Sequence, residues 1–427
     1  MKTFSICNLG CKVNNYEANW YRQELEKEYT EVPFGNEKAD IFIINSCTVT
    51  NTAGAKSRQM MHKARKLNPQ AVIAVVGCYA QMEYQNEGIF DDCDILIGSN
   101  HKKELPELIR KHLQTGERIV RVEEFRNAEF EEMAICRFNQ TRAYLKIQDG
   151  CNQFCSYCVI PFARGNPRCL QPDKAVQIAS DLVKSGHKEI VLTGIHTGRY
   201  YSENTDLTAL IKRLLNEVDG LERIRISSIE MTEVTDELIE LIASDSRVAR
   251  HLHIPLQAGS DRVLKAMNRP YTTAEYLARI NQIRAVLPNV SISADVIVGF
   301  PQETDEEYQI TEDFIREAEL SFLHVFPYAA KKHTVAAGMK GQIPETIKKQ
   351  RVAKLTKLSA DLYNTFVSRF VGGTGNVIFE RERDGVLLGH NSEYIEVHVQ
   401  GDSQYLHQNC TVRYTGFEGD HLLGELV

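Results

Sequence analysis

Short apolar runs and longer, helix-compatible stretches alternate along this chain from residue 3 to about residue 326. β-rich runs separated by helical stretches of ~10–15 residues indicate βαβ units and parallel sheets. In such folds the carboxyl ends of the strands line the site where ligands bind. We therefore predict an α/β multidomain protein in which the residues just after each apolar run carry the chemistry.

The first 120 residues have this pattern and contain three similarly placed cysteines. The apolar runs lie at residues 3–9, 41–44, 72–76 and 95–97, with helix-compatible stretches at 15–28 and 56–67. Cys11, Cys47 and Cys78 each lie just past the end of one of these runs. We expect a flavodoxin-like parallel α/β domain over residues 1–120, with the three thiolates converging on one metal site.

A second series of apolar runs begins near Arg142. The runs lie at residues 143–147, 189–192, 223–229, 251–256, 291–298 and 322–326. Helical stretches separate them, which predicts a partial (β/α)6 barrel over residues 137–360 with its chemistry at the carboxyl ends of the strands. The polar, irregular stretch 125–138 is interpreted as a linker between the two domains.

The last part of the chain changes to short runs separated by Gly, Asp and Asn turns. The runs lie at residues 376–380, 394–399 and 409–414. This pattern predicts a small all-β barrel over residues 363–427. Acidic residues outnumber basic ones in this part, so we do not expect it to be a general phosphate-binding surface.

Charge and cysteine content narrow the class of protein further. The chain has 427 residues, a formal charge of −7 and 11 cysteines. An odd number of cysteines without an apolar N-terminal leader argues against a disulfide framework and favours metal-binding thiolates in a reducing compartment. The longest apolar stretches are about six residues, far below the ~18 needed to span a bilayer. We expect a cytoplasmic protein with no membrane span.

One group of cysteines has a diagnostic spacing. Cys151, Cys155 and Cys158 form Cys-x3-Cys-x2-Cys directly after the first predicted barrel strand. Three thiolates on one loop reach three corners of an iron–sulfur cube, and the missing fourth cysteine leaves one metal position open for reaction. The alternatives are a zinc site with a distant fourth ligand and unligated core cysteines.

This spacing, with Tyr157 before the last cysteine, resembles the Cys-x3-Cys-x-aromatic-Cys signature of the radical S-adenosylmethionine (SAM) enzymes. The resemblance implies that Cys151, Cys155 and Cys158 hold a 4Fe-4S cluster whose open iron is chelated by SAM. In that family one electron from the cluster cleaves SAM to a 5′-deoxyadenosyl radical, while the protein binds and orients the reactants.

The segments around Cys11, Cys47 and Cys78 extend the resemblance to the methylthiotransferases of this superfamily. The matching motifs are residues 8–14, 44–50 and 76–81. The resemblance covers nearly the whole chain, and the C-terminal barrel corresponds to a TRAM domain. It implies a second 4Fe-4S cluster on Cys11, Cys47 and Cys78 that takes part in the sulfur chemistry, and a second SAM that donates the methyl group.

Three motifs, at residues 9–14, 192–198 and 225–230, are similar to one branch of this family. That branch adds a methylthio group to C2 of N6-threonylcarbamoyladenosine next to the tRNA anticodon. Neighbouring branches act on isopentenyladenosine in tRNA or on an aspartate of a ribosomal protein, and these substrates stay open as alternatives. The expected partners are a tRNA anticodon stem-loop, a reductant such as flavodoxin or ferredoxin, and a sulfur donor.

Further segments border the cofactor by the same resemblance. The candidate SAM contacts are Gly194, Gly198, Glu230, Gln257, Ser260 and Asp295. Turn glycines and structural hydrogen bonds are the alternative interpretation of these residues. The chain departs from the family pattern at Ala329, Lys331 and His333, where Ser, Arg and Gly are common. The remaining cysteines are expected to be core or incidental thiols: Cys7, Cys93, Cys136, Cys169 and Cys410.

Basic residues gather at three places that are candidates for RNA contact. They are Lys56, Arg58, Lys63, Arg65 and Lys66, then Arg164 and Arg168, and finally the helical stretch 348–357. Solvated helix faces are the default interpretation of such clusters. An anticodon loop supplies the unstacked nucleotide that base selection needs. A non-catalytic iron–sulfur or zinc protein that binds RNA is the alternative from another functional class.

Overall fold

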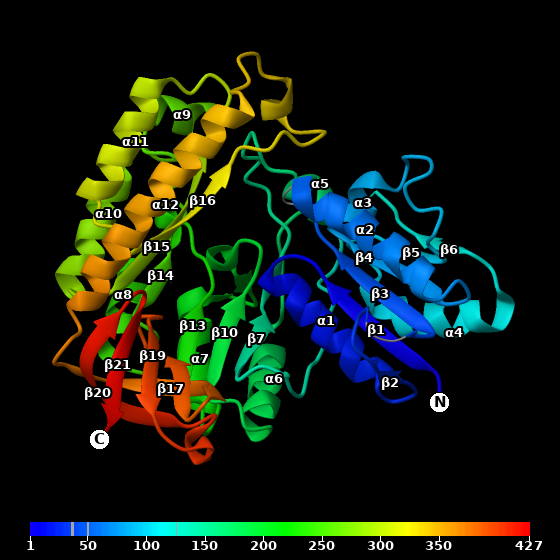
Figure 1. The fold of residues 1–427 in the computed structure, drawn as a ribbon, viewed down its shortest axis with the longest axis horizontal. Helices are drawn as coiled ribbons and strands as arrows, with labels where there is room; N and C mark the ends of the chain where they lie inside the picture. The colour runs from blue at the N-terminus through cyan, green and yellow to red at the C-terminus, as the bar shows by residue number, and fades with distance from the viewer. Residues whose placement is uncertain (36–37, 49–50, 125) are drawn as a thin grey trace.

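The computed structural model describes residues 1–35, 38–48, 51–124 and 126–427. Val49 and Thr50 of the second cysteine motif and Phe125 of the predicted linker lie outside these ranges. The predicted mixed α/β class is confirmed, with a closed five-stranded barrel at the C-terminal end (Figure 1). None of the helices in the described ranges combines the length and the apolar character needed to cross a membrane.

A six-stranded parallel sheet, in the order β2-β1-β3-β4-β5-β6, forms the N-terminal part. Its strands are β1 (Thr3–Asn8), β2 (Thr30–Glu31), β3 (Ile41–Ser46), β4 (Val72–Gly77), β5 (Ile95–Ile97) and β6 (Ile119–Arg121). Its helices are α1 (Lys12–Leu25), α2 (Asn51–Leu67), α3 (Cys78–Glu83), η1 (Lys102–Glu104) and α4 (Leu105–Thr115). The first five strands have the 2-1-3-4-5 order of flavodoxin-like sheets.

Both faces of this sheet are covered. Alternate residues of β3 and β4 join α1 and α4 in one hydrophobic cluster and α2 in another. Because β3 and β4 are buried along their whole length, they appear in the sequence as continuous apolar runs. The short edge strands β2 and β6 were not predicted, since two or three residues give no periodic signal.

Two three-stranded parallel sheets follow and together form an open half barrel. The first holds β7 (Arg142–Lys146), β10 (Glu189–Thr193) and β13 (Arg223–Ile226), and the second holds β14 (His251–His253), β15 (Ser291–Val298) and β16 (Phe322–Pro327). The Ile229 amide donates to the His253 carbonyl at 3.0 Å, so the two sheets adjoin between β13 and β14. The six apolar runs predicted from the sequence thus all correspond to strands.

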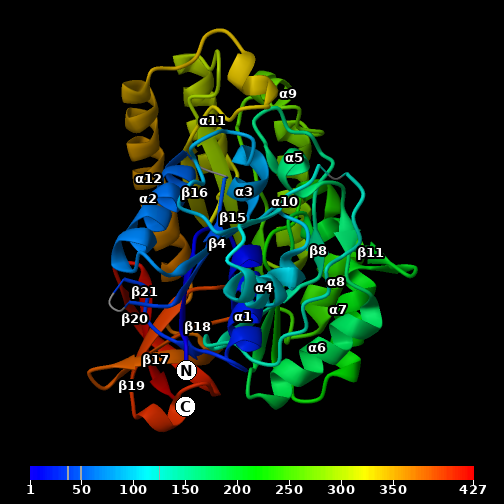
Figure 2. The same cartoon turned by 90° about the vertical axis from the view of Figure 1, so that its right-hand side faces the viewer.

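Helices and short elements connect these strands, and η4 and α12 lead from the last strand to the C-terminal barrel. The helices are α5 (Ile160–Arg164), α6 (Pro172–Lys184), α7 (Leu207–Glu217), α8 (Asp236–Ser244), α9 (Asp261–Ala266), α10 (Thr273–Val286), α11 (Asp305–Glu317) and α12 (Glu345–Ser368). The short elements are β8 (Gln148–Asp149), β9 (Arg168–Cys169), η2 (Thr197–Arg199), β11 (Tyr201–Ser202), β12 (Thr205–Asp206), η3 (Met231–Glu233) and η4 (Val335–Gly338). Figure 2 shows α6, α7 and α8 along one side of the half barrel.

The C-terminal barrel closes in the order β17-β18-β19-β21-β20. Its elements are β17 (Thr374–Arg383), β18 (Val386–His390), β19 (Glu396–Gln400), η5 (Ser403–Tyr405), β20 (Asn409–Glu418) and β21 (His421–Leu426). Arg223, the first residue of β13, donates to the Asn376 carbonyl at 2.8 Å, and Arg142, the first residue of β7, pairs with Glu380 at 3.2 Å. The barrel therefore docks at the amino-terminal ends of these strands, away from their carboxyl ends. Helix α12 continues past residue 363 and contributes Phe366 and Val367 to the barrel core.

The stretch 126–138 contains no helix or strand. It is nevertheless fixed, because the Gln23 side chain of α1 donates to the Ala134 carbonyl at 3.0 Å and accepts from the Cys136 amide at 2.8 Å. Met133 is buried in the hydrophobic cluster that continues from α1 into the half barrel. The N-terminal sheet and the half barrel therefore share one continuous core.

Candidate active site

Three neighbouring strands of the N-terminal sheet lead to the thiols of Cys11, Cys47 and Cys78. Cys11 follows β1 and precedes α1, Cys47 follows β3, and Cys78 is the first residue of α3 after β4. Because β1, β3 and β4 are adjacent and parallel, their carboxyl ends meet at one edge of the sheet. All eleven cysteines lie in the described part of the chain, and none of them is joined in a disulfide there.

Two glycines allow the turns that carry these cysteines to approach each other. Gly10 has φ +133°, and a Cβ there would lie 2.9 Å from the Cβ of Cys47. Gly77 has φ +105°, and a Cβ there would lie 2.9 Å from the Ser46 carbonyl oxygen. Side chains other than hydrogen are excluded at both positions by backbone conformation and by space.

Asn14 joins the first two turns. Its Nδ2 donates to the carbonyl oxygens of Leu9 and Ser46, both at 3.0 Å. Its Oδ1 lies 3.5 Å from the Sγ of Cys11. A buried amide that uses both its donors and its acceptor in this way fixes the relative position of the strand ends.

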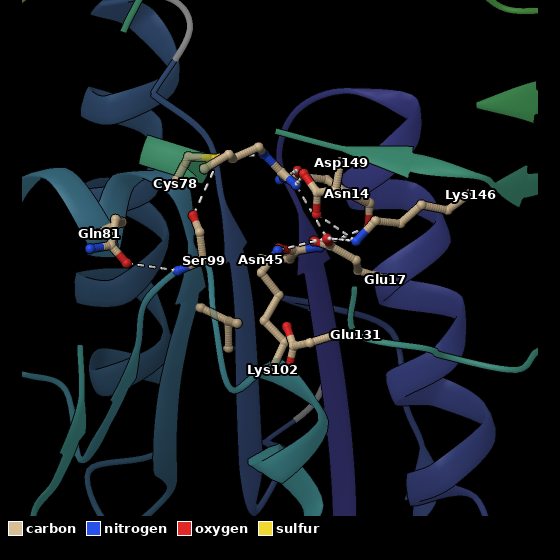
Figure 3. A network of polar contacts seen from close by, with 12 residues as sticks. Asn14, Glu17, Asn45, Cys78, Gln81, Ser99, Lys102, Glu131, Lys146 and Asp149 are labelled. Atoms are coloured by element: carbon tan, nitrogen blue, oxygen red, sulfur yellow. Dashed lines mark hydrogen bonds and ion pairs between the residues drawn. The ribbon is translucent and has the colours of Figure 1, made fainter. Parts of the chain in front are cut away.

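Arg164 joins the third cysteine to the same group. Its Nε donates to the Sγ of Cys78 at 3.1 Å, and its Nη2 donates to Oδ1 of Asn14 at 2.9 Å. The residue belongs to the half barrel, where it ends α5, yet it reaches into the N-terminal sheet. A contact chain therefore runs from Cys11 through Asn14 and Arg164 to Cys78 (Figure 3 labels Asn14 and Cys78).

A network of buried charges surrounds this contact chain (Figure 3). Glu17 Oε1 lies 2.6 Å from Lys102 Nζ, 3.1 Å from Lys146 Nζ and 3.4 Å from Arg164 Nη1. Asp149 Oδ2 lies 2.7 Å from Lys146 Nζ, and Asp149 Oδ1 lies 2.9 Å from Arg164 Nη1. All five residues are buried. The network joins α1 and η1 of the N-terminal sheet to β7, β8 and α5 of the half barrel.

The cations hold both carboxylates in the ionised form. Burial by itself raises the pKa of Glu17, but Lys102, Lys146 and Arg164 outweigh it and lower that pKa to about 2. Burial likewise opposes ionisation of Asp149, yet Arg164 and the neighbouring cations hold its pKa well below the ordinary value.

The loop that carries Cys151, Cys155 and Cys158 follows β8. The Sγ of Cys151 lies 3.4 Å from Nδ1 of His196, and the Sγ of Cys155 accepts from Arg269 Nη1 at 3.3 Å. The Cys158 amide donates to the Cys155 carbonyl at 2.9 Å, which closes the turn between these two cysteines. Two of the three thiols thus contact a nitrogen atom of a basic side chain, His196 or Arg269, from another part of the half barrel.

Each of these two basic side chains also pairs with a glutamate. His196 Nε2 lies 2.7 Å from Glu233, and Arg269 pairs with Glu230. Burial disfavours protonation of His196, but Cys151 and Glu233 raise its pKa to about 9. Glu230 was a candidate SAM contact in the sequence, whereas Arg269, which connects it to Cys155, was not recognised because no local motif surrounds it.

Two candidate glycines contact protein side chains. The space that a Cβ of Gly194 would take is bordered by Gln148 at 3.0 Å, and a Cβ of Gly198 would overlap Glu233. Gln148 Oε1 also accepts from the amides of Ile195 and His196, at 3.0 and 2.8 Å. Both glycines therefore allow the loop after β10 to pack closely on neighbouring elements.

The other three candidates lie in the second half of the barrel. The Gln257 amide donates to the Asp295 carbonyl at 2.8 Å, which places the two residues on adjoining strand ends. Asp295 is partly exposed, and its carboxylate lies 3.3 Å from Nε2 of His253. Ser260 is buried and lies directly before α9. In the loop where the chain departs from the family pattern, His333 has φ +68°, a conformation that favours glycine.

The thiols have the chemistry of metal ligands. Within the described ranges, no three His, Cys, Asp or Glu side chains converge on the position of one metal ion. A cubane cluster binds each cysteine to a different iron, so its thiolates do not converge in that way. Burial raises the pKa of Cys155, and that of Cys158 to about 12. Such thiols lose their protons when a metal binds them.

The buried charges fit an anionic group beside Cys78. Lys102, Lys146, Arg164 and Arg168 pair with two carboxylates, Glu17 and Asp149, in the ion pairs of the described residues. The cations outnumber the carboxylates in these pairs, which favours a further anionic group beside them. A cluster held by three thiolates would supply negative charge at the place where Arg164 points.

Several residues predicted as RNA contacts are structural. Arg164, Arg168, Lys348 and Arg351 are buried, so the interpretation of these four as surface contacts is wrong. Lys348 Nζ donates to the Tyr328 carbonyl at 3.0 Å, and Arg351 pairs with glutamate and aspartate side chains. Within the three basic clusters, the exposed residues are Lys56, Arg58, Lys63, Lys66, Lys349, Lys354 and Lys357.

Comparison with known proteins agrees with this arrangement. The family described as the radical SAM superfamily matches residues 145–315, and the one described as uncharacterized protein family UPF0004 matches residues 3–98. A solved structure of the radical SAM methyltransferase TsrM from Kitasatospora setae has a TM-score of 0.57 at 14% identity, covering 79% of this chain and 75% of that one. The fold and the cysteine loop define a radical SAM enzyme.

Sequence relatives give the family within that class. A threonylcarbamoyladenosine tRNA methylthiotransferase of Bacillus subtilis is 40% identical over 94% of this chain and 91% of its own length. One from Aquifex aeolicus is 38% identical over 92% of this chain and 95% of its own. A tRNA-2-methylthio-N(6)-dimethylallyladenosine synthase of Pelotomaculum thermopropionicum is 33% identical over 100% and 98%. The chain belongs to the radical SAM methylthiotransferase family.

Proposed function

We propose that this protein adds a methylthio group to C2 of N6-threonylcarbamoyladenosine at tRNA position 37, giving 2-methylthio-N6-threonylcarbamoyladenosine. The observation that carries the substrate assignment is the identity of 40% and 38%, over 94% and 92% of the chain, to relatives named for this nucleoside. The two groups of cysteines, one on the N-terminal sheet and one on the half barrel, support the reaction type.

In this proposal Cys151, Cys155 and Cys158 hold the 4Fe-4S cluster that binds SAM, and Cys11, Cys47 and Cys78 hold a second one. When bound, the clusters and SAM supply the radical and methylthio chemistry. His196 and Arg269 lie beside two thiols of the first group. Their positive charges favour the thiolate forms that cluster binding requires.

The remaining candidate residues shape the SAM site. Glu230 and Asp295 are partly exposed carboxylates suited to the charged ends of SAM, and Gln257 lies beside Asp295. Gly194 and Gly198 keep the loop after β10 close to its neighbours, and Ser260 is the N-cap residue of α9. We place these last three residues in a supporting role.

We assign residues 1–120 to the methylthiotransferase domain, 137–360 to the radical SAM domain and 363–427 to a TRAM domain. The substrate is presented as a tRNA anticodon stem-loop. A low-potential reductant such as flavodoxin or ferredoxin and a separate sulfur donor complete the reaction, and the cytoplasm, where tRNA is modified, is the place we propose for it.

Nucleoside mass spectrometry tests the substrate. We compare tRNA from cells that have the gene, lack it, or carry the C151A variant. The proposal expects loss of 2-methylthio-N6-threonylcarbamoyladenosine in the last two, with its precursor N6-threonylcarbamoyladenosine accumulating. An unchanged nucleoside profile contradicts the substrate assignment. Reconstituted protein should hold about eight irons per chain, and about four in the C11A/C47A/C78A variant.

A second substrate is favoured by one observation. The relative from Pelotomaculum thermopropionicum, 33% identical over the whole chain, is named for dimethylallyladenosine. The same mass spectrometry separates the two, because that activity produces 2-methylthio-N6-isopentenyladenosine and leaves the threonylcarbamoyl nucleoside unchanged.

A further inference from the structure

The loop that carries Cys151, Cys155 and Cys158 is called the radical loop below. The segment after it contacts both groups of cysteines. The Cys151 amide donates to the Gly165 carbonyl at 3.0 Å. The preceding residue, Arg164, donates from Nε to the Sγ of Cys78 at 3.1 Å. Two consecutive residues therefore hold the first cysteine of one group and the third cysteine of the other.

This segment is tightly packed. Gly150 has φ +76°, and a Cβ there would lie 2.7 Å from the Gly165 carbonyl oxygen. Arg164 is fully buried, and its guanidinium donates to Glu17, Asp149 and Asn14. The backbone carbonyl of Arg164 accepts from the side chain of Arg168. A guanidinium held by so many partners has one orientation, so its Nε is aimed at Cys78.

We propose that Arg164 is a positioning residue for the second cluster, presented by the segment that follows the radical loop. Its N–H group and positive charge stabilise the Cys78 thiolate, and its backbone continues into the turn that holds Cys151. The inference rests on the proposed function, because it requires a cluster on Cys11, Cys47 and Cys78.

The physical consequence concerns the reduction potential and metal affinity of that cluster. Hydrogen bonds to the sulfurs and nearby positive charge stabilise the reduced, more negative state of an iron–sulfur cluster. Loss of a residue that orients a metal ligand typically weakens metal binding about 10–100-fold. Arg164 supplies both the hydrogen bond and the charge at Cys78.

The test uses the full chain in the C151A/C155A/C158A background, in which the second cluster is the only one. R164Q removes the charge, and R164K keeps it on a shorter donor. The matched control is K102M, which removes an equally buried cation of the same network that contacts Glu17. Circular dichroism of the metal-free proteins checks folding, and R164K serves as the reporter if R164Q does not fold.

We measure the potential by a redox titration followed by electron paramagnetic resonance, and the rate of iron release to a chelator. R164Q is expected to shift the potential to more negative values and to release iron about 10–100-fold faster. R164K is expected to give a smaller potential shift, and K102M to stay near the background protein in both measurements.

Equal effects of R164Q and K102M would show that Arg164 acts only through the total charge of the network, which overturns its positioning role. R164Q without effect on either measurement overturns it as well. Both outcomes leave the proposed function intact. A background protein that takes up no iron instead overturns the second cluster, and the role of Arg164 falls with it.

Discussion

Replacing Glu17 with glutamine tests how strongly the buried network stabilises the N-terminal part of the protein. Glu17 is fully buried, and its Oε1 contacts Lys102 at 2.6 Å, Lys146 at 3.1 Å and Arg164 at 3.4 Å. Glutamine has nearly the same shape but no charge. In Glu17→Gln, Lys146 and Arg164 still have Asp149, whereas Lys102 loses the carboxylate that Figure 3 shows beside it.

The expected loss is large because the stranded cation stays buried. Removing one partner of a buried ion pair costs about 3–5 kcal/mol in the free energy of unfolding. The matched control is Glu24→Gln on the same helix, which removes the Lys27–Glu24 pair, whose lysine side chain is 61% exposed. Exposed pairs contribute only ~0.2–1 kcal/mol, so the two variants should differ by about 3 kcal/mol.

Urea denaturation of the metal-free protein, followed by tryptophan fluorescence, measures this difference. Trp20 is the single tryptophan of the chain, and it lies buried on α1 one turn after Glu17. Its emission therefore reports unfolding of the part that contains the network. The free energies come from linear extrapolation to zero urea.

A double variant sharpens the test. In E17Q/K102M the stranded cation is removed as well, so stability should recover in part and the two changes should not add. The reasoning is refuted if E17Q is no less stable than E24Q, or if K102M lowers the stability of E17Q further by its full single-variant effect.

Three further predictions concern pH, the radical loop and the RNA surface. Glu17 and Asp149 have lowered pKa values, so their ionised forms stabilise the folded protein above pH ~4, and this contribution is lost as the pH falls toward 2. Between pH 7 and pH 3 the free energy of unfolding, measured by urea titration, should therefore fall more in wild type than in E17Q. In Gly150→Ala the new Cβ overlaps the Asn166 carbonyl at φ +76°, so iron should fall from about eight to about four per chain with the circular dichroism spectrum retained. Lys348→Met should lower the melting temperature without changing tRNA affinity, because this lysine is buried. Alanine at three exposed lysines should instead weaken tRNA binding and reduce its salt dependence, both measured by filter binding. These lysines are Lys349, Lys354 and Lys357.

Much of the fold could be predicted because its signals are local. β15 matches the predicted run at residues 291–298, and the runs before Cys11, Cys47 and Cys78 are β1, β3 and β4. A buried parallel strand is a continuous apolar run, and such a run is visible without knowledge of its neighbours. The edge strands β2 and β6 were missed because two or three residues give no periodic signal. The barrel strands β18 and β21 were missed because each is short and contains a glycine, Gly389 or Gly424, which weakens the strand signal.

The candidate site was predicted unevenly for the same reason. Cysteine spacing and strand ends predict the six thiols as cluster ligands, because both are properties of short segments. Arg164 was assigned to the RNA surface, since a basic residue after a metal-binding loop has no sequence mark of burial. For the buried charge network the sequence offered one signal, which is a charged residue within or just after an apolar run, and this signal occurs at Lys146 and Asp149.

The sequence by itself determined which thiols lie at strand ends and which loop has the spacing of a radical cluster, because chain geometry links neighbouring residues. Only the tertiary structure decided that Arg164 contacts Cys78, 86 positions away, and Glu17, 147 positions away. Burial and charge pairing depend on which segments the core brings together, and no local pattern encodes that choice.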